Sequence, residues 1–189
     1  MYKKDLRKNY LKLRLALSEL EYQELNQELC NSFFSSVDLS SINTIHMFLP
    51  IVTKKEPDTW LMIDRLQKNF PGIRISIPKM NGEDGLINFY FAGRDQIRNN
   101  NLGIPEPQYG EITPPEKIDL VIVPLLGFDR MGNRAGYGKG YYDILLKECR
   151  PDCKKIGISF FEPVDQIADI NPYDVKLTQC ITPKKKYTF

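Results

Sequence analysis

Three observations predict that this chain folds as a single α/β domain, with three α/β/α layers around a mostly parallel sheet. Its 189 residues suit one domain with a sizeable core. Short apolar runs rich in β-branched residues alternate with stretches of helical periodicity, as in β–α–β units. The run at residues 118–124 leads through a glycine-rich segment to apolar positions at 144–146, which is a strand–loop–helix pattern.

Two helices are expected at the start of the chain. Residues 3–17 alternate basic and leucine positions and predict a first helix with a basic face. Ser18 and Glu21 then form a capping-box pattern, which predicts a second helix through about residue 34. Four residues are expected to face inward from this second helix: Leu20, Leu25, Leu29 and Phe33.

Apolar runs bounded by proline and glycine predict the remaining elements. Strands are expected at residues 43–49, 73–78, 86–91, 155–160 and 179–182. One helix is expected to open at 57–59, with Trp60, Ile63 and Leu66 inward, and a short one to form at 165–169. Residues 93–117 indicate a loop with little regular structure, and a loop of that length is often functional. The basic run at 184–186 is expected to be a solvated tail.

Composition argues against several classes of protein. A net charge of +2 gives no bulk electrostatic case for binding nucleic acid or a membrane surface. No apolar run approaches the roughly 20 residues that span a bilayer, and the charged start lacks a signal-peptide pattern, so a cytoplasmic protein with reduced cysteines is expected. The chain has a single histidine, His46, which argues against a zinc site. His46 lies in an apolar strand pattern and is expected to be buried rather than catalytic.

Between the strand at 118–124 and the following helix, residues 132–140 hold four glycines, at 132, 136, 138 and 140, with Arg134 and Lys139 among them. Glycines allow backbone N–H groups to approach a ligand closely, and a helix N-terminus favours an anion. The spacing is not that of a Walker A loop, since Gly140 follows Lys139. The alternative is a tight connection with no ligand, but such a turn needs only one or two glycines.

The loop sequences Gly-Phe-Asp, Gly-Asn-Arg and Gly-x-Gly-Lys-Gly-Tyr-Tyr-Asp between residues 127 and 143 resemble the signature of the 5-formyltetrahydrofolate cyclo-ligases, or methenyltetrahydrofolate synthetases. The resemblance covers most of the chain, with further matches at residues 3–7, 56–59 and 104–107, and at Asp174 and Thr182. The chain departs from many members in having Tyr173 in place of His and Pro183 in place of Glu.

This resemblance implies an enzyme that uses ATP and Mg²⁺ to convert 5-formyltetrahydrofolate into 5,10-methenyltetrahydrofolate, with release of ADP and phosphate. Phosphorylation of the formyl oxygen would activate the formyl carbon, and the neighbouring N10 would then attack it. Catalysis of this kind is mainly positioning and neutralisation of charge. The expected partners are therefore the two small-molecule substrates, and a monomer is expected, with a dimer as the alternative.

The resemblance also assigns site residues. ATP contacts are implied for Lys3, Lys4, Arg7, Arg134, Ala135, Gly136, Tyr137, Gly138, Lys139, Gly140, Tyr141 and Tyr142, of which Arg134 and Lys139 are expected to be catalytic. Folate contacts are implied for Leu49, Glu56, Tyr137, Gly138, Lys139, Gly140 and Tyr141. The magnesium ligands are expected to be Asp143 and Asp174.

Plainer interpretations stand beside these assignments. Lys3 and Arg7 also fit a solvated basic face, Asp143 fits a carboxylate that stabilises a helix N-terminus, and Glu56 fits a solvated residue before Pro57. Two other functions remain open from the residues alone. One is a different enzyme that uses ATP or a sugar phosphate, and the other is a nucleotide- or RNA-binding module, which would normally be strongly basic.

Overall fold

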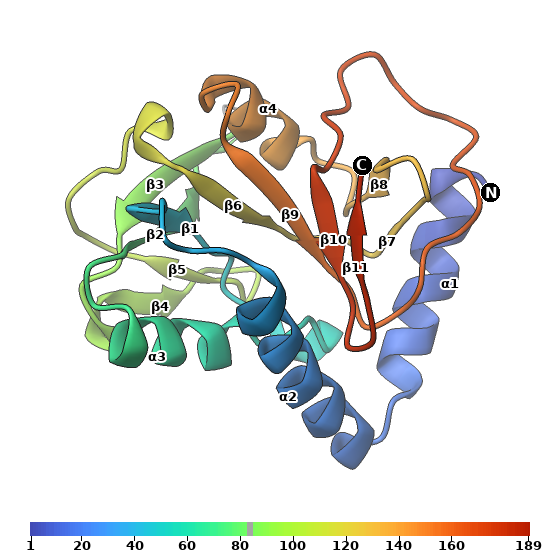
Figure 1. The fold of residues 1–189 in the computed structure, drawn as a ribbon, viewed down its shortest axis with the longest axis horizontal. Helices are drawn as coiled ribbons and strands as arrows, with labels where there is room; N and C mark the ends of the chain where they lie inside the picture. The colour runs from blue at the N-terminus through green and yellow to red at the C-terminus, as the bar shows by residue number, and fades with distance from the viewer. Residues whose placement is uncertain (83–84) are drawn as a thin grey trace.

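The structure, a computed structural model, describes residues 1–82 and 85–189. Its centre is a seven-stranded sheet in the order β11-β10-β9-β6-β1-β2-β3 (Figure 1). These strands are β1 (Thr44–His46), β2 (Arg74–Met80), β3 (Leu86–Tyr90), β6 (Leu120–Val123), β9 (Lys154–Ile158), β10 (Gln179–Ile181) and β11 (Lys186–Thr188). The five inner strands pair in parallel and the two outermost ones are antiparallel. The predicted α/β class with a mostly parallel sheet is confirmed.

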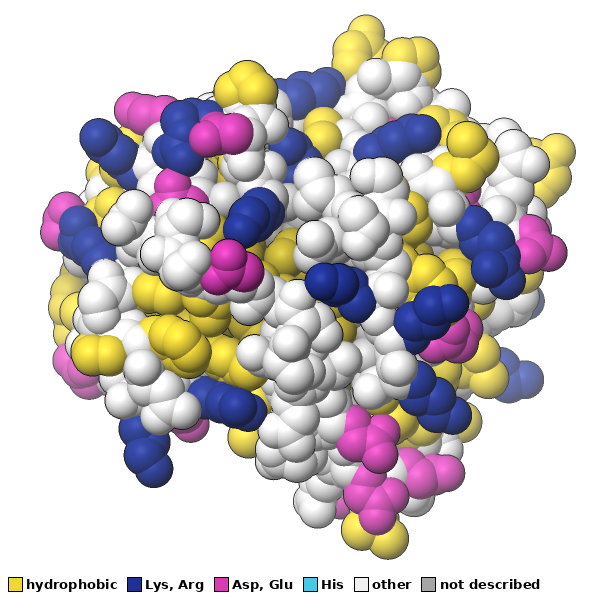
Figure 2. Space-filling model, in the orientation of Figure 1, with side chains coloured by type: hydrophobic (Ala, Val, Ile, Leu, Met, Phe, Trp, Pro, Cys, Tyr) yellow, Lys and Arg dark blue, Asp and Glu magenta, His cyan; other side chains and the backbone are white. Residues whose placement is uncertain are grey.

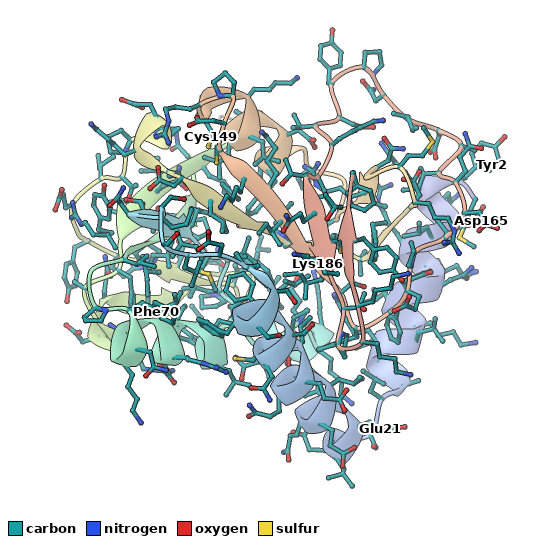
Figure 3. All side chains as sticks on the ribbon, in the orientation of Figure 1. Tyr2, Glu21, Phe70, Cys149, Asp165 and Lys186 are labelled. Atoms are coloured by element: carbon teal, nitrogen blue, oxygen red, sulfur yellow. The ribbon has the colours of Figure 1, made fainter. Side chains whose placement is uncertain are left out.

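Side chains that alternate along the strands build a core on each face of the sheet. On β6, Leu120 and Ile122 join the core under α2 (Glu19–Ser36) and α3 (Thr59–Asn69). Val121 and Val123 join the opposite core, which α4 (Tyr141–Glu148) covers. Side chains fill the space between these layers (Figure 3). The three predicted layers are therefore present.

Helix α1 (Lys3–Ala16) lies beside the β7–β8 hairpin (Gly127–Phe128 and Arg134–Ala135) rather than in either helical layer (Figure 1). Leu6 of this helix is fully buried against Leu126, Ala135 and Ile167. Gly127 permits the close approach, because a Cβ at that position would lie 2.6 Å from Leu6 Cδ2. The basic helix is thereby fixed across the end of the sheet where the ligand cavity forms.

Helix α2 begins as the sequence predicts. The Ser18 hydroxyl accepts from the Glu21 N–H, and the Glu21 carboxylate accepts from the Ser18 N–H at 2.7 Å, which is the full capping box at the end of the helix marked by Glu21 in Figure 3. Leu29 and Phe33 are buried as expected. The inward prediction for Leu20 is wrong, because this side chain in the first turn is 66% exposed and precedes the part of α2 that reaches the sheet.

The prediction that residues 93–117 lack regular structure is also wrong. They contain an antiparallel hairpin of β4 (Ile97–Asn99) and β5 (Pro105–Pro107), between the short 3₁₀ turns Arg94–Gln96 and Pro115–Lys117. The hairpin is held by hydrogen bonds from Asn100 N to Ile104 O and from Gln108 N to Gln96 O. With this register, Pro105 and Pro107 occupy positions where a backbone N–H would point away from the partner strand. Two prolines in three residues conceal a strand when only the sequence is read.

Two further predictions near the C-terminus are corrected. Residues 165–169 form no helix, because the Ile167 N–H donates to the buried Asp129 carboxylate and the Val164 N–H donates to Phe128 O. The lysines at 184–186 are exposed, as expected, but they are not a tail, since Lys186 begins β11, which pairs with β10. Among the described residues, the structure contains no helix long and apolar enough to cross a membrane.

A buried carboxylate holds the hairpin that precedes the glycine-rich loop. Asp129 is 0% exposed, and its Oδ1 accepts from the N–H groups of Met131 and Asn133, each at 2.9 Å. Its Oδ2 accepts from the Asn133 side-chain amide at 2.8 Å and from Ile167 N at 3.0 Å. The Gly-Phe-Asp and Gly-Asn-Arg parts of the sequence signature thus hold the hairpin that precedes the loop.

We expect Asp129→Asn to lower the free energy of unfolding by about 3 kcal/mol or more. The amide that replaces one carboxylate oxygen would confront donor groups, and a hydrogen bond to a buried charge is worth about 1.5–3 kcal/mol. Asp165→Asn is the matched control, since Asp165 is an exposed partner of Arg130 and its loss should change stability by less than about 0.5 kcal/mol. Urea denaturation measures both; equal stability of the two variants would contradict this role of Asp129.

Candidate active site

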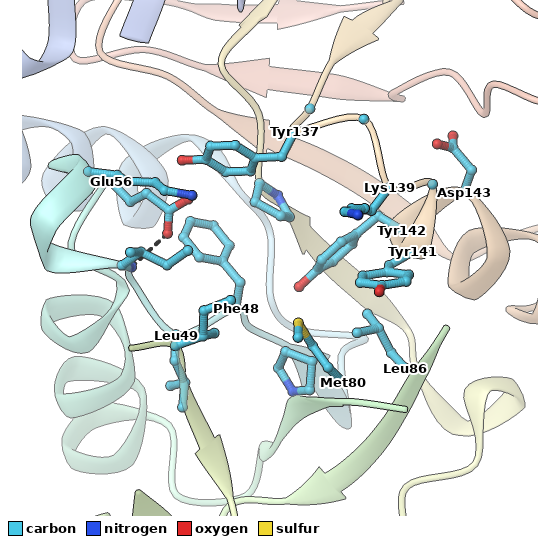
Figure 4. A pocket seen from close by; sticks show the side chains of 18 of the residues that line it. Phe48, Leu49, Glu56, Met80, Leu86, Tyr137, Lys139, Tyr141, Tyr142 and Asp143 are labelled. Atoms are coloured by element: carbon cyan, nitrogen blue, oxygen red, sulfur yellow. Dashed lines mark hydrogen bonds between the residues drawn. The ribbon is translucent and has the colours of Figure 1, made fainter. Parts of the chain in front are cut away.

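A cavity of about 620 Å³ opens beyond the carboxyl ends of β1, β2 and β6, where ligands bind in open parallel sheets. One side is the glycine-rich loop and the other is apolar, as the close view in Figure 4 shows. The lining residues come from six parts of the chain: Lys3, Arg7, Phe48, Leu49, Ile51, Lys54, Glu56, Pro78, Met80, Leu86, Leu102, Ile104, Pro105, Glu106, Pro124, Arg134, Gly136, Tyr137, Gly138, Lys139, Gly140, Tyr141, Tyr142, Asp143 and Asp174.

The glycine-rich loop presents a run of unpaired backbone donors. Within residues 1–82 and 85–189, no acceptor is found for the N–H groups of residues 136–142. Gly138 and Gly140 have φ angles of +94° and +75°, which side chains with a Cβ rarely adopt. Gly140 O then accepts from Asp143 N at 2.9 Å and from Ile144 N at 3.1 Å, which starts α4. This geometry suits an anion at the helix N-terminus.

Helix α1 holds the loop through its basic face. Arg7 Nε donates to Gly136 O at 2.7 Å, and the guanidinium packs against Gly138, where an added Cβ would lie 3.4 Å from Arg7 Cζ. Lys3 is 9% exposed and pairs with Asp174. The solvated-face interpretation of these two cations is therefore wrong. Of the other residues expected around ATP, Lys4 is exposed and Ala135 is buried in the core, and neither lines the cavity.

The remaining predicted polar residues lie together beside the loop. Arg134, which is 8% exposed, donates through Nη2 to Asp143 Oδ1 at 2.9 Å and through Nη1 to Val175 O. Asp143 Oδ1 also accepts from Val175 N at 2.9 Å. Partial burial raises the pKa of Asp174, but the hydrogen bonds from Lys3 and the Asn171 N–H outweigh it and keep the pKa below its usual range. Asp174 is thus ionised near neutral pH, and the carboxylates of Asp143 and Asp174 both border the cavity.

The apolar side of the cavity contains the deeply placed carboxylate of Glu56. Glu56 is 3% exposed, and its Oε2 accepts from Ile51 N at 2.7 Å (Figure 4). No cation pairs with it among the described residues. The interpretation of Glu56 as a solvated residue is therefore wrong. Apolar and aromatic side chains surround this part of the cavity: Phe48, Leu49, Pro78, Met80, Leu86, Leu102 and Ile104.

Several lining residues were not identified from the sequence. Glu106 on β5 is 9% exposed, and its Oε2 accepts from Asn100 Nδ2 at 3.1 Å. It lies in the segment 104–107, whose match to the family pattern was the available signal. Lys54 and the nearby Arg14 carried no such signal, because a basic residue on an amphipathic helix or in a loop is usually solvated.

A buried histidine contacts the cavity wall from behind. His46 is 0% exposed, as predicted, with Nδ1 3.3 Å from Ser76 Oγ and Nε2 3.3 Å from Tyr142 Oη. Burial lowers the pKa of His46 to about 3 and raises the pKa of Tyr142 far above its usual value. Both side chains therefore remain uncharged near neutral pH, and Tyr142 presents a neutral aromatic wall to the cavity.

The fold and the cavity define an α/β protein in which a glycine-rich loop lies next to an apolar pocket beyond the carboxyl ends of the parallel strands. A sequence model of the 5-formyltetrahydrofolate cyclo-ligase family matches residues 1–183, and the chain belongs to this family. The family resemblance of the sequence is thereby confirmed.

Two relatives and one solved structure match this chain over nearly its full length. The 5-formyltetrahydrofolate cyclo-ligase of Mycoplasma pneumoniae is 32% identical over 181 residues, covering 94% of this chain and 96% of that protein. The Escherichia coli K12 cyclo-ligase is 25% identical, covering 91% and 95%. The solution structure of Aquifex aeolicus 5,10-methenyltetrahydrofolate synthetase superimposes with a TM-score of 0.83 at 28% identity, covering 100% of this chain and 93% of its own.

We expect the single histidine to stay neutral in the folded protein down to about pH 4, while an unfolded chain takes up a proton near pH 6.5. The contribution of His46 to the free energy of unfolding is therefore lost as pH falls from 6.5 towards 3. Between pH 7 and pH 5 this loss is about 2 kcal/mol. An NMR titration of the imidazole measures the pKa, and urea denaturation of His46→Gln at both pH values isolates the loss. A native-state pKa near 6.5 would contradict the buried neutral ring.

Proposed function

We propose that this protein converts 5-formyltetrahydrofolate into 5,10-methenyltetrahydrofolate in an ATP-dependent reaction that releases ADP and phosphate. The supporting observation is one cavity that combines a run of backbone N–H groups, for which the described residues offer no acceptor, with an apolar pocket around a buried carboxylate. A triphosphate suits the N–H groups of the loop, and a pterin ring suits the apolar pocket. Membership of the cyclo-ligase family supplies the reaction class.

The chemistry explains why two such parts are needed. The formyl group on N5 is an amide, so its carbon is a poor electrophile and its oxygen a poor leaving group. Transfer of the γ-phosphoryl group to the formyl oxygen gives an iminium-type phosphate. N10 attacks the activated carbon, the N10 proton is released, and breakage of the C–O bond expels phosphate. The protein then has to align the formyl oxygen with the γ-phosphoryl group and neutralise charge.

Lys139 and Arg134 are the proposed catalytic cations, and the loop amides are the proposed phosphate ligands. Lys139 is exposed on the loop and carries a mobile point charge that can follow the phosphoryl group. Arg134 is held by Asp143 and Val175, so its guanidinium is preorganised at the cavity wall. Lys3 and Arg7 of α1 also line the cavity and add positive charge beside the loop. Donors fixed before the reaction stabilise developing charge most effectively.

Asp143 and Asp174 fit the proposed magnesium site. Both carboxylates line the cavity next to the loop, and for each the hydrogen bonds found among the described residues involve a single oxygen. Mg²⁺ typically takes one or two carboxylates together with phosphate oxygens and waters. A bound Mg²⁺ would neutralise the phosphate oxygens that otherwise face these carboxylates. Arg134 and Lys3 keep both side chains oriented in the absence of the ion.

Glu56 is the proposed pterin anchor, with Leu49 as an apolar contact. The pterin 2-amino group and the adjacent ring N–H form a flat pair of donors, which an ionised carboxylate accepts together. The Ile51 N–H fixes Oε2 of Glu56, so the carboxylate is oriented before the substrate arrives. Tyr141 is a candidate for the facing aromatic wall, because its hydroxyl donates to Gly82 O at 2.8 Å and holds the ring at the cavity edge.

Two other functions fit this cavity less well. An enzyme that uses ATP or a sugar phosphate without a pterin has no need for a buried Glu56 that, among the described residues, has no cation partner and borders apolar side chains. A nucleic-acid-binding module normally has a strongly basic surface. On the face shown in Figure 2, Lys and Arg side chains are interspersed with Asp and Glu.

One assay separates these functions. The protein is incubated with 5-formyltetrahydrofolate, ATP and magnesium chloride, and the methenyl product is followed by its absorbance. We expect product formation that requires all three additions. ATP hydrolysis without methenyl product would favour another ATP-using enzyme, and neither reaction would favour a binding module.

We expect Lys139→Ala to lower kcat by roughly 10²–10³-fold, because loss of one group aimed at developing charge costs about 2.7–4 kcal/mol. The melting temperature should not change, since Lys139 is exposed. Lys147→Ala is the control, an exposed lysine on α4 outside the cavity, and should retain full activity. Arg134→Lys should also lower kcat. Near-normal turnover in both Lys139→Ala and Arg134→Lys would refute the phosphate assignment of this loop.

We expect Glu56→Gln to raise the KM for 5-formyltetrahydrofolate by about tenfold or more, because one acceptor becomes a donor that faces the pterin donors and a bond of about 1.5–3 kcal/mol is lost. The KM for ATP, measured at saturating folate, should change little and serves as the internal control. Steady-state kinetics with each substrate varied in turn makes the test. An unchanged folate KM, or an equal rise in both values, would show that Glu56 is not the pterin anchor.

A further inference from the structure

A buried arginine ties the two parts of the cavity together without belonging to either. Arg14 near the end of α1 is 4% exposed. Its Nε donates to Lys54 O at 2.8 Å, and its Nη2 donates to the Tyr137 hydroxyl. No carboxylate pairs with this guanidinium among the described residues. A buried charge with only neutral partners is costly, so its contacts need an explanation.

Tyr137 receives this bond from within the glycine-rich loop and also contacts the segment that carries Glu56. Its hydroxyl lies towards Glu56 in Figure 4, and Lys54 Nζ lies 4.3 Å from the centre of its ring. Burial, followed by the negative charge of Glu56, raises the pKa of Tyr137 well above its usual value. The hydroxyl therefore keeps its proton, accepts from Arg14 and has a proton to share with Glu56.

We propose that Arg14 is a positioning residue that, through Tyr137, couples the glycine-rich loop to the Glu56 end of the cavity, so that each substrate binds more tightly when the other is present. The proposal rests on the proposed function, because it assigns the triphosphate to the loop and the pterin to Glu56. Binding at the loop and binding at Glu56 would then affect each other.

The physical basis is that binding of either substrate orders the glycine-rich loop, at a cost in conformational entropy. The glycine-rich loop is irregular and residues 52–54 form only one short 3₁₀ turn, and Arg14 contacts both segments. A pterin that fixes Glu56 also fixes Tyr137 and hence the loop backbone next to it. The entropy lost in ordering the loop is then smaller when the triphosphate binds, which is positive coupling without a large change of structure. Linkage requires the same factor in the opposite direction.

The test measures binding without turnover. Calorimetry gives the Kd of a non-hydrolysable ATP analogue with magnesium, in the absence and in the presence of saturating 5-formyltetrahydrofolate. For the wild type we expect the Kd without folate to be about five times the Kd with folate, or more. This ratio is the lower end of typical coupling between sites. Tyr137→Phe removes only the hydroxyl, and its ratio should fall to near one. Arg14→Gln should behave in the same way, and the double variant should show no further loss.

Tyr10→Phe is the matched control. Tyr10 lies on the same helix, and its hydroxyl donates to Glu162 O away from the cavity, so the ratio should remain that of the wild type. A ratio near one in the wild type, or an unchanged ratio in both Tyr137→Phe and Arg14→Gln, would overturn the coupling. Failure of the proposed function is a separate result, namely wild-type protein that forms no methenyl product.

Discussion

The backbone N–H groups of residues 136–142 constrain the rest of the site, because each needs an acceptor and none is found in the described part of the chain. Anionic oxygens are strong acceptors for such N–H groups. The loop can keep this conformation only if other groups hold it. Arg7 holds Gly136 O from α1, and Gly140 O is fixed by the first turn of α4.

The supports of this loop lie mostly outside the cavity. Asp129 fixes the hairpin before it, and Gly132 permits the close approach of Phe189, since a Cβ there would lie 2.8 Å from that ring. The C-terminal strand β11 brings Phe189 to this position. The glycine and acidic residues of the signature therefore have two functions: some face the ligand, and others hold the loop from behind.

How much could be read from the sequence depended on whether the signal was local. The capping box, the parallel strands and the glycine-rich loop each follow from neighbouring residues, and all were predicted. The β4–β5 hairpin was missed because its two prolines resemble a loop, and Arg14 was missed because its partners lie 40 and 123 positions away. The absence of a helix at 165–169 likewise depends on the distant Asp129. Long-range hydrogen bonds, rather than propensity, decided these cases.

The claim that the loop amides bind phosphate is tested most directly by NMR of ¹⁵N-labelled protein titrated with ATP and magnesium. The resonances of Gly136, Gly138 and Gly140 lie in the region of the spectrum characteristic of glycine amides, and they report on the donors themselves. The account predicts that these amides, with those of Tyr141 and Tyr142, show the largest shifts, and that Lys139→Ala reduces them. Large shifts elsewhere, with the loop amides unchanged, would contradict it.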